Sequence, residues 1–376
     1  MEMKKKLILS PVGISLLLNS LRKEESEFKR TLLQESNALQ LPEEIQVKVD
    51  DLVQRATKKL QHGSVSERRK LSAELNSLYA LYENDAHNTE TIHILLKTDT
   101  ALGEKSAEIL EKFLREEWHS PNIISIPVKG LNTASLASFS RGIKNLLKKF
   151  DKMIPDYKEK GYEIIFNLTG GFKSLQGYLN IIGMFYADRL VYIFERSSEL
   201  LTIPKLPIKI DEEKLYKNAT KLALLDEGVI FSHEELSIGD ALLDIDEENN
   251  VSLSEWGQLA WYRVKRDIFS KELVEFPHII YEQSFKKDFE KTKELRVRMQ
   301  ESIAKASAIL LDNNGDITAL KRDGGLKYDD YSGKNNIGHF RIDDGNRITC
   351  VYKKEKLYLR HFGSHNYTQK IETGKK

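Results

Sequence analysis

The 376-residue sequence contains a single cysteine, Cys350. One thiol cannot form a disulfide within the chain, and a zinc site built mainly from cysteines is excluded as well. The nine histidines are scattered and never show the His-Glu-x-x-His spacing that places two imidazoles on one helix face. We therefore expect no metal and no bound cofactor, so that any catalysis uses ordinary side chains.

Long apolar runs are also missing. No run approaches the ~20 residues that a helix needs to cross a bilayer, so we expect no membrane partner. The first ten residues include Lys4, Lys5 and Lys6 but continue into a strand-like segment, without the apolar core and cleavage site of a secretion signal. We expect a cytoplasmic location, because a reducing compartment also suits a chain with one cysteine.

A strong excess of either charge is absent, since the net charge is +1, but the charges are unevenly distributed. Residues 211–255 contain 3 Lys/Arg and 13 Asp/Glu, a net charge of −10. Residues 276–376 contain 20 Lys/Arg and 14 Asp/Glu, a net charge of +6. The basic last part favours a polyanionic partner, whereas the acidic middle would be repelled by nucleic-acid phosphates.

Two adjacent glycines mark the stretch around which the first half of the chain is organised. Residues 162–166 form an apolar, β-rich run, and apolar residues at helical spacing follow from 175 onward. Glycines let backbone amides approach a ligand, and the start of a helix directs free N–H groups to the same place. The sequence therefore predicts an anion-binding turn with the candidate contacts Asn167, Thr169, Gly170, Gly171, Phe172, Lys173 and Ser174.

The alternative for this turn is a tight turn with no ligand. Its spacing is neither that of a Walker loop nor that of the Gly-x-Gly-x-x-Gly dinucleotide fingerprint.

Strand-like and helical segments alternate up to residue 195. We expect strands over 6–9, 91–96, 123–128, 162–166 and 189–195, and helices that include 14–21, 28–82, 103–118 and 134–150. This alternation predicts an α/β domain with a mostly parallel sheet, whose loops at the carboxyl ends of the strands meet in one crevice. Further candidate contacts are therefore Ser10, Pro11, Val12, Gly13, Ile14 and Ser15 after the first strand, and Thr98, Asp99 and Thr100 after the second.

Both loops have simpler explanations. Residues 10–15 could be an ordinary strand-to-helix turn, and Thr98 or Asp99 could cap the helix that follows.

The stretch Asn-Leu-Thr-Gly-Gly-Phe-Lys-Ser at 167–174, placed between two strands, closely resembles the ligand-binding motif of CARF domains, the CRISPR-associated Rossmann-like sensors. The resemblance implies a Rossmann-like domain over 1–205 that forms a homodimer. It also implies that this domain binds a cyclic oligoadenylate, with cyclic tetra-adenylate as the expected ring, made by a type III CRISPR complex. Residues 10–15 resemble the first loop of such a domain.

Residues 206–275 break the alternation. We expect one helix over 211–225, a turn-linked pair of strands around 247–250, and a helix that Ser254 caps. A winged-helix DNA reader would have a similar size and order, but the net charge of −10 favours a connector.

Residues 276–376 have a different pattern. A short strand over 277–281 precedes a helical segment over 285–311, and three strands follow at hairpin spacing over 338–342, 347–352 and 356–361. In the first hairpin strand, His339 and Arg341 share one face while Phe340 and Ile342 share the other. We expect one face of this sheet to be buried and the other to be lined with cations.

This order of strand, helices and antiparallel hairpins resembles the RelE/ParE-like toxin fold, specifically the mRNA interferases. The matching segments are 339–348 and 361–367. The resemblance implies a small α+β domain with an antiparallel sheet and a catalytic set, which here comprises Arg347, Arg341, His339, His365 and Tyr367, with Lys321 and Lys327 as candidates for a further upstream position. An inserted Asn366 separates His365 from Tyr367.

Without a metal, RNA cleavage must use the neighbouring 2′-hydroxyl as the nucleophile. The reaction needs a base for that hydroxyl, cations for the phosphate and an acid for the departing 5′-oxygen. Arg341 and Arg347 suit the phosphate, His365 suits proton transfer, and Tyr367 could stack on a base or lend its hydroxyl. Alternatively, the arginines only pair with aspartates, and the residues 365–367 only end a strand.

The expected function is therefore a cyclic oligoadenylate-activated, metal-independent mRNA endoribonuclease in type III CRISPR antiviral defence. The RelE resemblance implies that cleavage depends on the ribosome. One alternative is a CARF-linked transcription regulator that binds DNA through the middle region. Another is a different nuclease, although the sequence shows no convincing carboxylate pair for a two-metal DNase.

Overall fold

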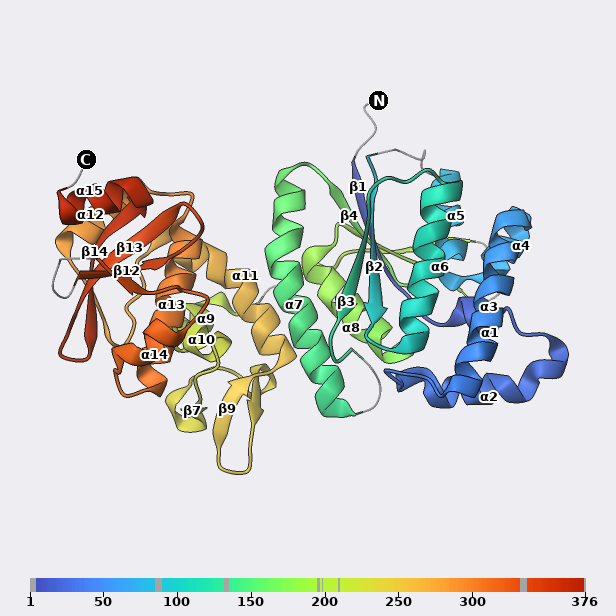
Figure 1. Ribbon diagram of the computed structural model, residues 1–376, viewed down its shortest axis with the longest axis horizontal. Helices are drawn as coiled ribbons and strands as arrows, with labels where there is room; N and C mark the ends of the chain where they lie inside the picture. The colour runs from blue at the N-terminus through green and yellow to red at the C-terminus, as the bar shows by residue number, and fades with distance from the viewer. Residues whose placement is uncertain are drawn as a thin grey trace. The chain divides into compact units, whose positions relative to one another are not determined.

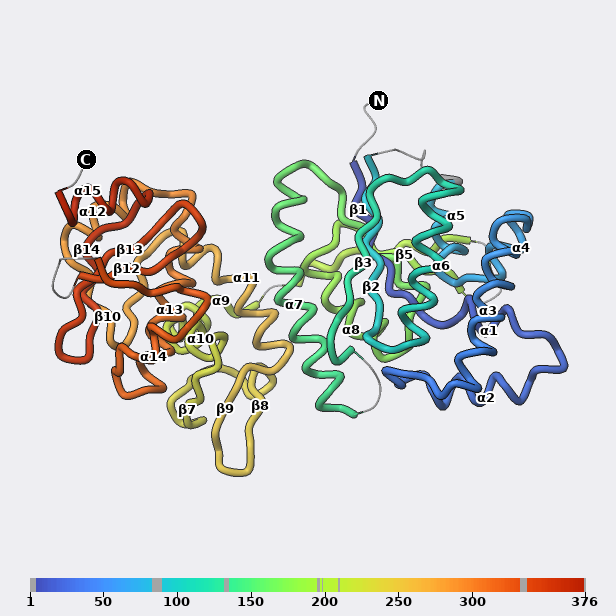
Figure 2. Tube along the Cα trace, in the orientation of Figure 1, coloured from blue at the N-terminus to red at the C-terminus, as the bar shows by residue number. Residues whose placement is uncertain are grey.

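The computed structural model describes residues 5–84, 90–131, 135–194, 197, 199–208, 210–331 and 337–374. Its contacts divide the chain into two compact units, Met1–Lys209 and Ile210–Lys376 (Figure 1 and Figure 2). The three-part division at 205 and 275 stays a prediction, and nearly all of its second and third parts fall in the second unit. The expected helix start at 134 and strand end at 195 lie outside the described residues.

The first unit is built on a six-stranded sheet. Its strand order is β3 (Ile123–Val128), β2 (Ile92–Thr98), β1 (Lys6–Pro11), β4 (Glu163–Asn167), β5 (Arg189–Ile193) and β6 (Leu200–Ile203). The first five strands run parallel to their neighbours, and β6 is antiparallel to β5. The expected α/β class with parallel strands is confirmed. The strand order reverses between β1 and β4, the position at which such sheets form a ligand crevice.

The central strands are apolar because helices cover both faces of the sheet. All six residues of β1 are buried, and Ile164, Ile165 and Phe166 of β4 have no exposed surface. Figure 1 shows α7 and α8 on one side of the sheet and α5 and α6 on the other. The helices are α1 (Ser15–Leu18), α2 (Ser26–Gln34), α3 (Glu43–His62), α4 (Val65–Leu71), α5 (Ala73–Asn84), α6 (Ala101–Glu117), α7 (Leu136–Glu159) and α8 (Lys173–Tyr186), with 3₁₀ turns η1 (Lys23–Glu25) and η2 (Glu35–Asn37).

Three local predictions for the first unit need correction. The helix expected over 14–21 is only the single turn α1, and α7 continues past its expected end to Glu159 with Pro155 inside it. Neither Thr98 nor Asp99 caps α6. The cap is Thr100, whose hydroxyl accepts a hydrogen bond from the Gly103 amide at 3.3 Å.

The second unit begins with a small helical and β region. It contains α9 (Glu212–Lys217), α10 (Ala219–Asp226), β7 (Phe231–Ser232), η3 (His233–Glu235), η4 (Asp240–Leu242), β8 (Leu243–Ile245), β9 (Asn250–Leu253) and α11 (Glu255–Lys271). The strands form an antiparallel sheet in the order β7-β9-β8, and Ser254 caps α11 as expected. The single helix expected over 211–225 is wrong, because Asn218 leaves helical geometry and its side-chain amide donates to the Lys214 carbonyl at 2.9 Å.

The rest of the second unit contains a five-stranded sheet in the order β10-β14-β13-β12-β11. The strands are β10 (Ile279–Tyr281), β11 (Asp329–Asp330), β12 (Ile337–Arg341), β13 (Asn346–Lys353) and β14 (Lys356–Ser364). The helices are α12 (Gln283–Lys291), α13 (Arg296–Asp312), α14 (Ile317–Arg322) and α15 (His365–Thr373). Strand β10 is parallel to β14, and the other pairs are antiparallel, so the sheet that we expected to be antiparallel is mixed.

Two predictions for this sheet's surroundings also need correction. The helical segment expected over 285–311 is split into α12 and α13 by a break at 292–295, next to which the Arg296 guanidinium donates to the Phe289 carbonyl at 3.1 Å. Residues 365–367 do not end a strand. They begin α15, whose cap Ser364 accepts from the Tyr367 amide at 3.3 Å.

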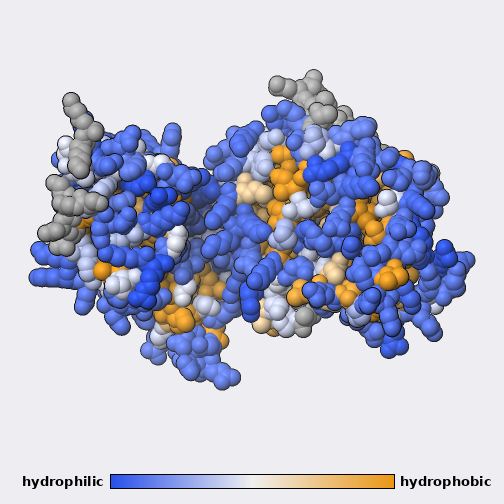
Figure 3. Space-filling model, in the orientation of Figure 1, coloured by the Kyte–Doolittle hydropathy of each residue, from blue (hydrophilic) through white to orange (hydrophobic). Residues whose placement is uncertain are grey.

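No helix among the described residues is long and apolar enough to span a bilayer. In the view of Figure 3, the faces of both units are mostly hydrophilic with smaller apolar areas. The described residues also contain no group of three or more His, Cys, Asp or Glu side chains placed to hold a metal ion. Cys350 is buried and free.

Candidate ligand cleft and candidate anion site

The loops after β1 and β4 meet through the buried side chain of Asn167. Its amide nitrogen donates to the Ser10 hydroxyl at 3.1 Å, and its oxygen accepts from the Ser77 hydroxyl at 2.7 Å and the Thr169 amide at 3.2 Å. The structure therefore brings the first loop and the Gly-Gly turn together. Ser77 was not expected from the sequence, and it contributes from α5.

Both glycines of the turn are required by geometry. Gly171 has a φ of +81°, which side-chain-bearing residues rarely adopt. A Cβ on Gly170 would lie 2.4 Å from the Pro11 carbonyl oxygen and 2.4 Å from a Glu74 carboxylate oxygen. The turn is therefore packed closely against the first loop and against α5.

Glu74 is a buried carboxylate that the sequence did not single out. Its side chain accepts hydrogen bonds from the Gly13 amide at 2.8 Å, the Ser72 hydroxyl at 2.7 Å and the Ser15 hydroxyl at 3.3 Å. The Glu74 carboxylate thus already binds the Gly13 amide and the Ser15 hydroxyl, two donors that we expected to face a ligand. Its position in the first turn of a helix, after a capping serine, was the signal available in the sequence.

The first loop is mainly a support for the crevice. Ser10, Pro11 and Val12 are buried, whereas Gly13, Ile14 and Ser15 are only partly buried.

A cavity of about 950 Å³ opens beside the Gly-Gly turn. From the predicted motif, Thr169, Gly171 and Lys173 line it. Further lining residues that the sequence did not indicate are Arg69 and Lys70 of α4, Asn76 of α5 and Gln176 of α8. None of the described residues that line this cavity is acidic, and its cations Arg69, Lys70 and Lys173 would attract a ligand bearing phosphates.

Hydrogen bonds hold the polar side chains of this cavity in place. Arg69 Nε donates to the Asn76 side-chain oxygen at 2.8 Å, and the Asn76 amide nitrogen donates to the Ser197 carbonyl at 3.2 Å. Gln176 Nε2 donates to the Gly170 carbonyl at 2.9 Å. Lys173 is exposed at the start of α8, where its charge adds to the positive end of the helix.

The remaining predicted contacts lie outside the lining of this cavity. Ser174 is exposed on α8, and Phe172 packs its ring 6.0 Å from that of Phe139. After β2, the Thr98 and Thr100 hydroxyls bond to each other at 2.9 Å, and the Asp99 carboxylate accepts from the Gly130 amide at 2.9 Å. These three residues therefore act at least as supports for their own loop.

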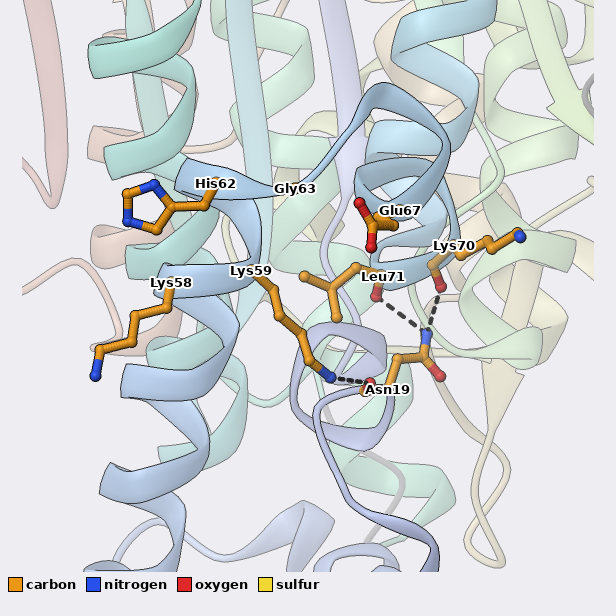
Figure 4. Close-up of a pocket in the computed structure, with 8 residues that line it drawn as sticks. All are labelled: Asn19, Lys58, Lys59, His62, Gly63, Glu67, Lys70 and Leu71. Atoms are coloured by element: carbon orange, nitrogen blue, oxygen red, sulfur yellow. Dashed lines mark hydrogen bonds between the residues drawn. The ribbon is translucent and has the colours of Figure 1, made fainter.

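A second cavity, of about 570 Å³, lies between α1, α3 and α4 (Figure 4). Its basic side chains do not converge. Lys59 donates to the Asn19 carbonyl at 3.3 Å, and Figure 4 shows Lys58 and His62 pointing away from Asn19. The cavity beside the Gly-Gly turn is thus the better candidate ligand cleft.

In the second unit, the five-stranded sheet has one apolar and one cationic face, as the alternation predicted. Phe340 and Ile348 are fully buried on the apolar face. On the other face Arg341 of β12 lies directly opposite Arg347 of β13. Opposite residues of an antiparallel pair have Cβ atoms about 5 Å apart, so two like charges are held close together.

Arg347 is the most unusual residue of this face. It is only 7% exposed, and its Nε and Nη1 atoms are buried with no hydrogen-bond partner among the described residues. Buried arginines normally pair with carboxylates or carbonyl groups, because an uncompensated buried charge is costly. We call Arg347, Arg341 and the two histidines described next, His339 and His365, the anion site.

Two histidines belong to the anion site. The pKa of the half-buried His339 is lowered by burial and then by the positive charge of Arg347. The exposed His365, the first residue of α15, has a pKa lowered by partial burial and then by Arg347 and Arg341. Both imidazoles are therefore biased toward the neutral form that can accept a proton.

Tyr367 reaches the same face, but its hydroxyl is engaged. It donates to the Asp288 carboxylate at 3.3 Å, and its pKa is raised by burial, by the charge of Asp288 and by that hydrogen bond. Gly363, opposite Arg347, permits this approach, since a Cβ there would lie 2.7 Å from the Tyr367 ring.

The two lysine candidates are placed differently. Lys321 of α14 forms an ion pair with Asp330 at 2.5 Å, which compensates its charge. Lys327 is exposed with a φ of +49°, and it directly follows Leu326, whose carbonyl accepts from the Arg341 amide at 2.8 Å. The backbone at Lys327 is therefore beside the anion site.

Sequence reasoning missed His361 and Asp288. His361 of β14 contacts Asp288 of α12 through Nδ1 at 3.2 Å, and Asp288 is only 8% exposed. A buried aspartate between the core residues Phe285 and Phe289 was the available signal, because carboxylates are rarely buried without a partner.

The strand order defines the first unit as a Rossmann-like α/β domain. The cleft beside the Gly-Gly turn, lined in part by the segments that follow β4 and β5, is its candidate site for a phosphate-bearing ligand. Residues 69–206 match the family model described as CRISPR-associated protein (Cas_APE2256). The matched segment includes the Gly-Gly turn, Arg69 and Lys173. The match supports a CRISPR-associated protein.

Proposed function

We propose that the chain is a CARF-type sensor joined to a RelE-like ribonuclease. A cyclic oligoadenylate, expected to be cyclic tetra-adenylate, binds in the cleft of the first unit and activates metal-independent cleavage of mRNA by the second. The family match and the cation-lined cleft support the sensor. The anion site supports the ribonuclease.

The observation that carries the ribonuclease is the buried guanidinium of Arg347, whose Nε and Nη1 atoms have no hydrogen-bond partner among the described residues. A charge in that state lowers stability unless a ligand completes its interactions. The guanidinium can donate two parallel hydrogen bonds to a phosphate, and Arg341 opposite it adds a second cation. A scissile RNA phosphate is the anion that such a site would stabilise, most strongly when charge builds up in the transition state.

In this reaction the 2′-oxygen attacks the adjacent phosphorus, and the bond to the 5′-oxygen breaks. The products are a 2′,3′-cyclic phosphate and a 5′-hydroxyl. Arg347 and Arg341 stabilise the crowded phosphate, and histidines of the anion site move protons. The anion site is small, and positioning can contribute ~7–11 kcal/mol to lowering a barrier. We therefore propose that the ribosome holds the message for attack.

We also propose that the sensor acts as a homodimer, since a cyclic ligand with two-fold symmetry fits a site on a two-fold axis. The resulting activity would serve type III CRISPR antiviral defence.

The test is an RNA cleavage assay with the full chain, with and without cyclic tetra-adenylate, on naked message and on message in translating ribosomes. We expect ligand-dependent cleavage on ribosomes that survives a chelator selective for transition metals, with free Mg²⁺ held constant because ribosomes require it. Arg347→Lys should abolish it, because a lysine cannot reproduce the two-point contact, while Arg360→Lys on the neighbouring strand should not. Loss of activity with the chelator would contradict the RelE-like assignment, and equal rates on both substrates would contradict the ribosome requirement.

The alternative, a DNA-binding transcription regulator, is less well supported. The order β7-β9-β8 suits a wing, but the described segment between β7 and β8 contains only η3 and η4, of three residues each. Neither is long enough to serve as a recognition helix in a major groove. Binding of the full chain to duplex DNA, measured with and without cyclic tetra-adenylate, tests this alternative directly.

A further inference from the structure

His361 and Asp288 form a hydrogen-bonded pair at the edge of the anion site. The Asp288 carboxylate accepts hydrogen bonds from His361 Nδ1 at 3.2 Å, from the Phe362 amide at 3.1 Å and from the Tyr367 hydroxyl at 3.3 Å. The carboxylate is thus anchored from three directions. An ionised carboxylate only accepts hydrogen bonds, so Nδ1 carries the proton and the lone pair of the neutral ring is on Nε2.

The Nε2 atom of His361 has no hydrogen bond among the described residues. Within the part of the chain that the structure describes, the imidazole of His361 has a hydrogen bond only through Nδ1. Its side chain is 16% exposed, and Nε2 is not among the fully buried atoms without a partner. The atom can therefore meet a bound substrate.

The strand register places His361 within reach of the arginines. His361 is opposite Thr349, and Arg347 lies two residues before Thr349 on the same face of β13. Such diagonal neighbours have Cα atoms about 7–8 Å apart, a distance that an imidazole, a guanidinium and a phosphate between them can span.

We propose that His361 is a catalytic base of the ribonuclease and that Asp288 is its positioning residue, which rests on the proposed function above. The 2′-hydroxyl proton moves to Nε2 while the 2′-oxygen forms its bond to phosphorus. The bond from phosphorus to the 5′-oxygen breaks, and this oxygen takes a proton from a water molecule. The imidazolium then returns its proton to the resulting hydroxide.

Asp288 has two tasks in this scheme. It holds the imidazole in the tautomer with the free lone pair on Nε2, and its negative charge stabilises the imidazolium that forms. Tyr367 helps indirectly, because its hydroxyl bond fixes the carboxylate.

Neither His339 nor His365 has a hydrogen bond to a carboxylate among the described residues. Asp329, opposite His339, favours the charged form of that ring, but burial and Arg347 outweigh it and the pKa is lowered. For His365, Arg347 and Arg341 also oppose the charge that it would gain as a base.

The experiment measures single-turnover cleavage by the ligand-activated full chain on translating ribosomes, from pH 5 to 9. We expect His361→Gln to slow cleavage by ~10²–10⁴-fold and to remove the acid limb of the pH–rate profile. Asp288→Asn should slow it by ~10–100-fold and shift that limb to lower pH. His233→Gln, on a surface histidine of the same unit, is the matched control and should match the wild type.

A second substrate identifies the step. A message with a sulfur in place of the scissile 5′-oxygen needs no proton on its leaving group. If His361 is the base, His361→Gln should be slow on both substrates. A defect confined to the oxygen substrate would make His361 an acid and overturn the assignment.

Rescue separates a chemical role from a folding defect. Added imidazole should restore part of the activity of His361→Ala, and failure of rescue in a variant that retains the wild-type melting temperature would overturn the proposal. Full activity of His361→Gln would overturn it while leaving the ribonuclease intact. A wild-type protein without RNA cleavage would instead refute the proposed function on which it rests.

Discussion

Replacing Arg347 by methionine should stabilise the second unit while it abolishes RNA cleavage. The guanidinium is 7% exposed, with Nε and Nη1 unpartnered among the described residues. Each buried donor without a partner costs ~1–3 kcal/mol, and methionine fills most of the same space without donors. Allowing for imperfect packing, we expect a gain of roughly 2–4 kcal/mol in the free energy of unfolding.

Hydrogen exchange of peptides from β12 to β14 in the full chain measures this gain locally. For a unit of this size, the melting temperature should rise by about 4–16 °C. Arg360→Met is the matched control. Arg360 Nε donates to Glu372 at 3.0 Å, so its loss removes a partner from a buried carboxylate and should lower stability.

Anion binding provides an independent check. Inorganic phosphate at 100 times its dissociation constant should stabilise the wild type by ~2.7 kcal/mol and the Arg347→Met variant much less. A loss of stability in Arg347→Met would mean that the guanidinium is already satisfied in the folded protein. The argument for a phosphate-binding role would then fail.

Other predictions concern the ligand cleft and the pH dependence. Lys173→Ala should weaken cyclic tetra-adenylate binding by ~1.5–3 kcal/mol in isothermal titration, whereas Lys58→Ala in the second cavity should not, and equal losses would contradict the choice of cleft. Gly170→Ala should destabilise the first unit, because its Cβ would lie 2.4 Å from a backbone oxygen, while Gly177→Ala, with open space around it, should stabilise α8 by ~0.5–1 kcal/mol. Thermal melts of both variants test this contrast, which fails if the two shifts agree in sign. The lowered pKa of His339 means that the unfolded chain binds more protons than the folded one, so the stability of the second unit is complete above the ordinary histidine pKa and falls as the pH drops below it. His339→Gln should flatten that fall in urea titrations between pH 7 and 5, and an unchanged slope would contradict the depressed pKa.

Local sequence patterns predicted much of the fold. The apolar, β-rich runs at 6–9 and 162–166 became the buried central strands, and the alternation of His339, Phe340 and Arg341 identified the two faces of β12. Such features depend on neighbouring residues alone. Some wrong predictions also have a local cause. At Asn218, a hydrogen bond from the side chain to the Lys214 carbonyl interrupts a helix that the periodicity of the apolar residues favoured.

The sequence by itself determined which segments become strands and helices, and it drew attention to the Gly-Gly turn and to the cationic strand face. Only the tertiary structure decided which of these side chains have partners. It placed Glu74 on the Gly13 amide, paired Lys321 with Asp330, and left Arg347 buried without a partner among the described residues. It also joined Asp288 to His361, 73 residues away in the chain. Periodicity and propensity act over a few residues, whereas burial and charge pairing depend on contacts between distant segments, which no local pattern encodes.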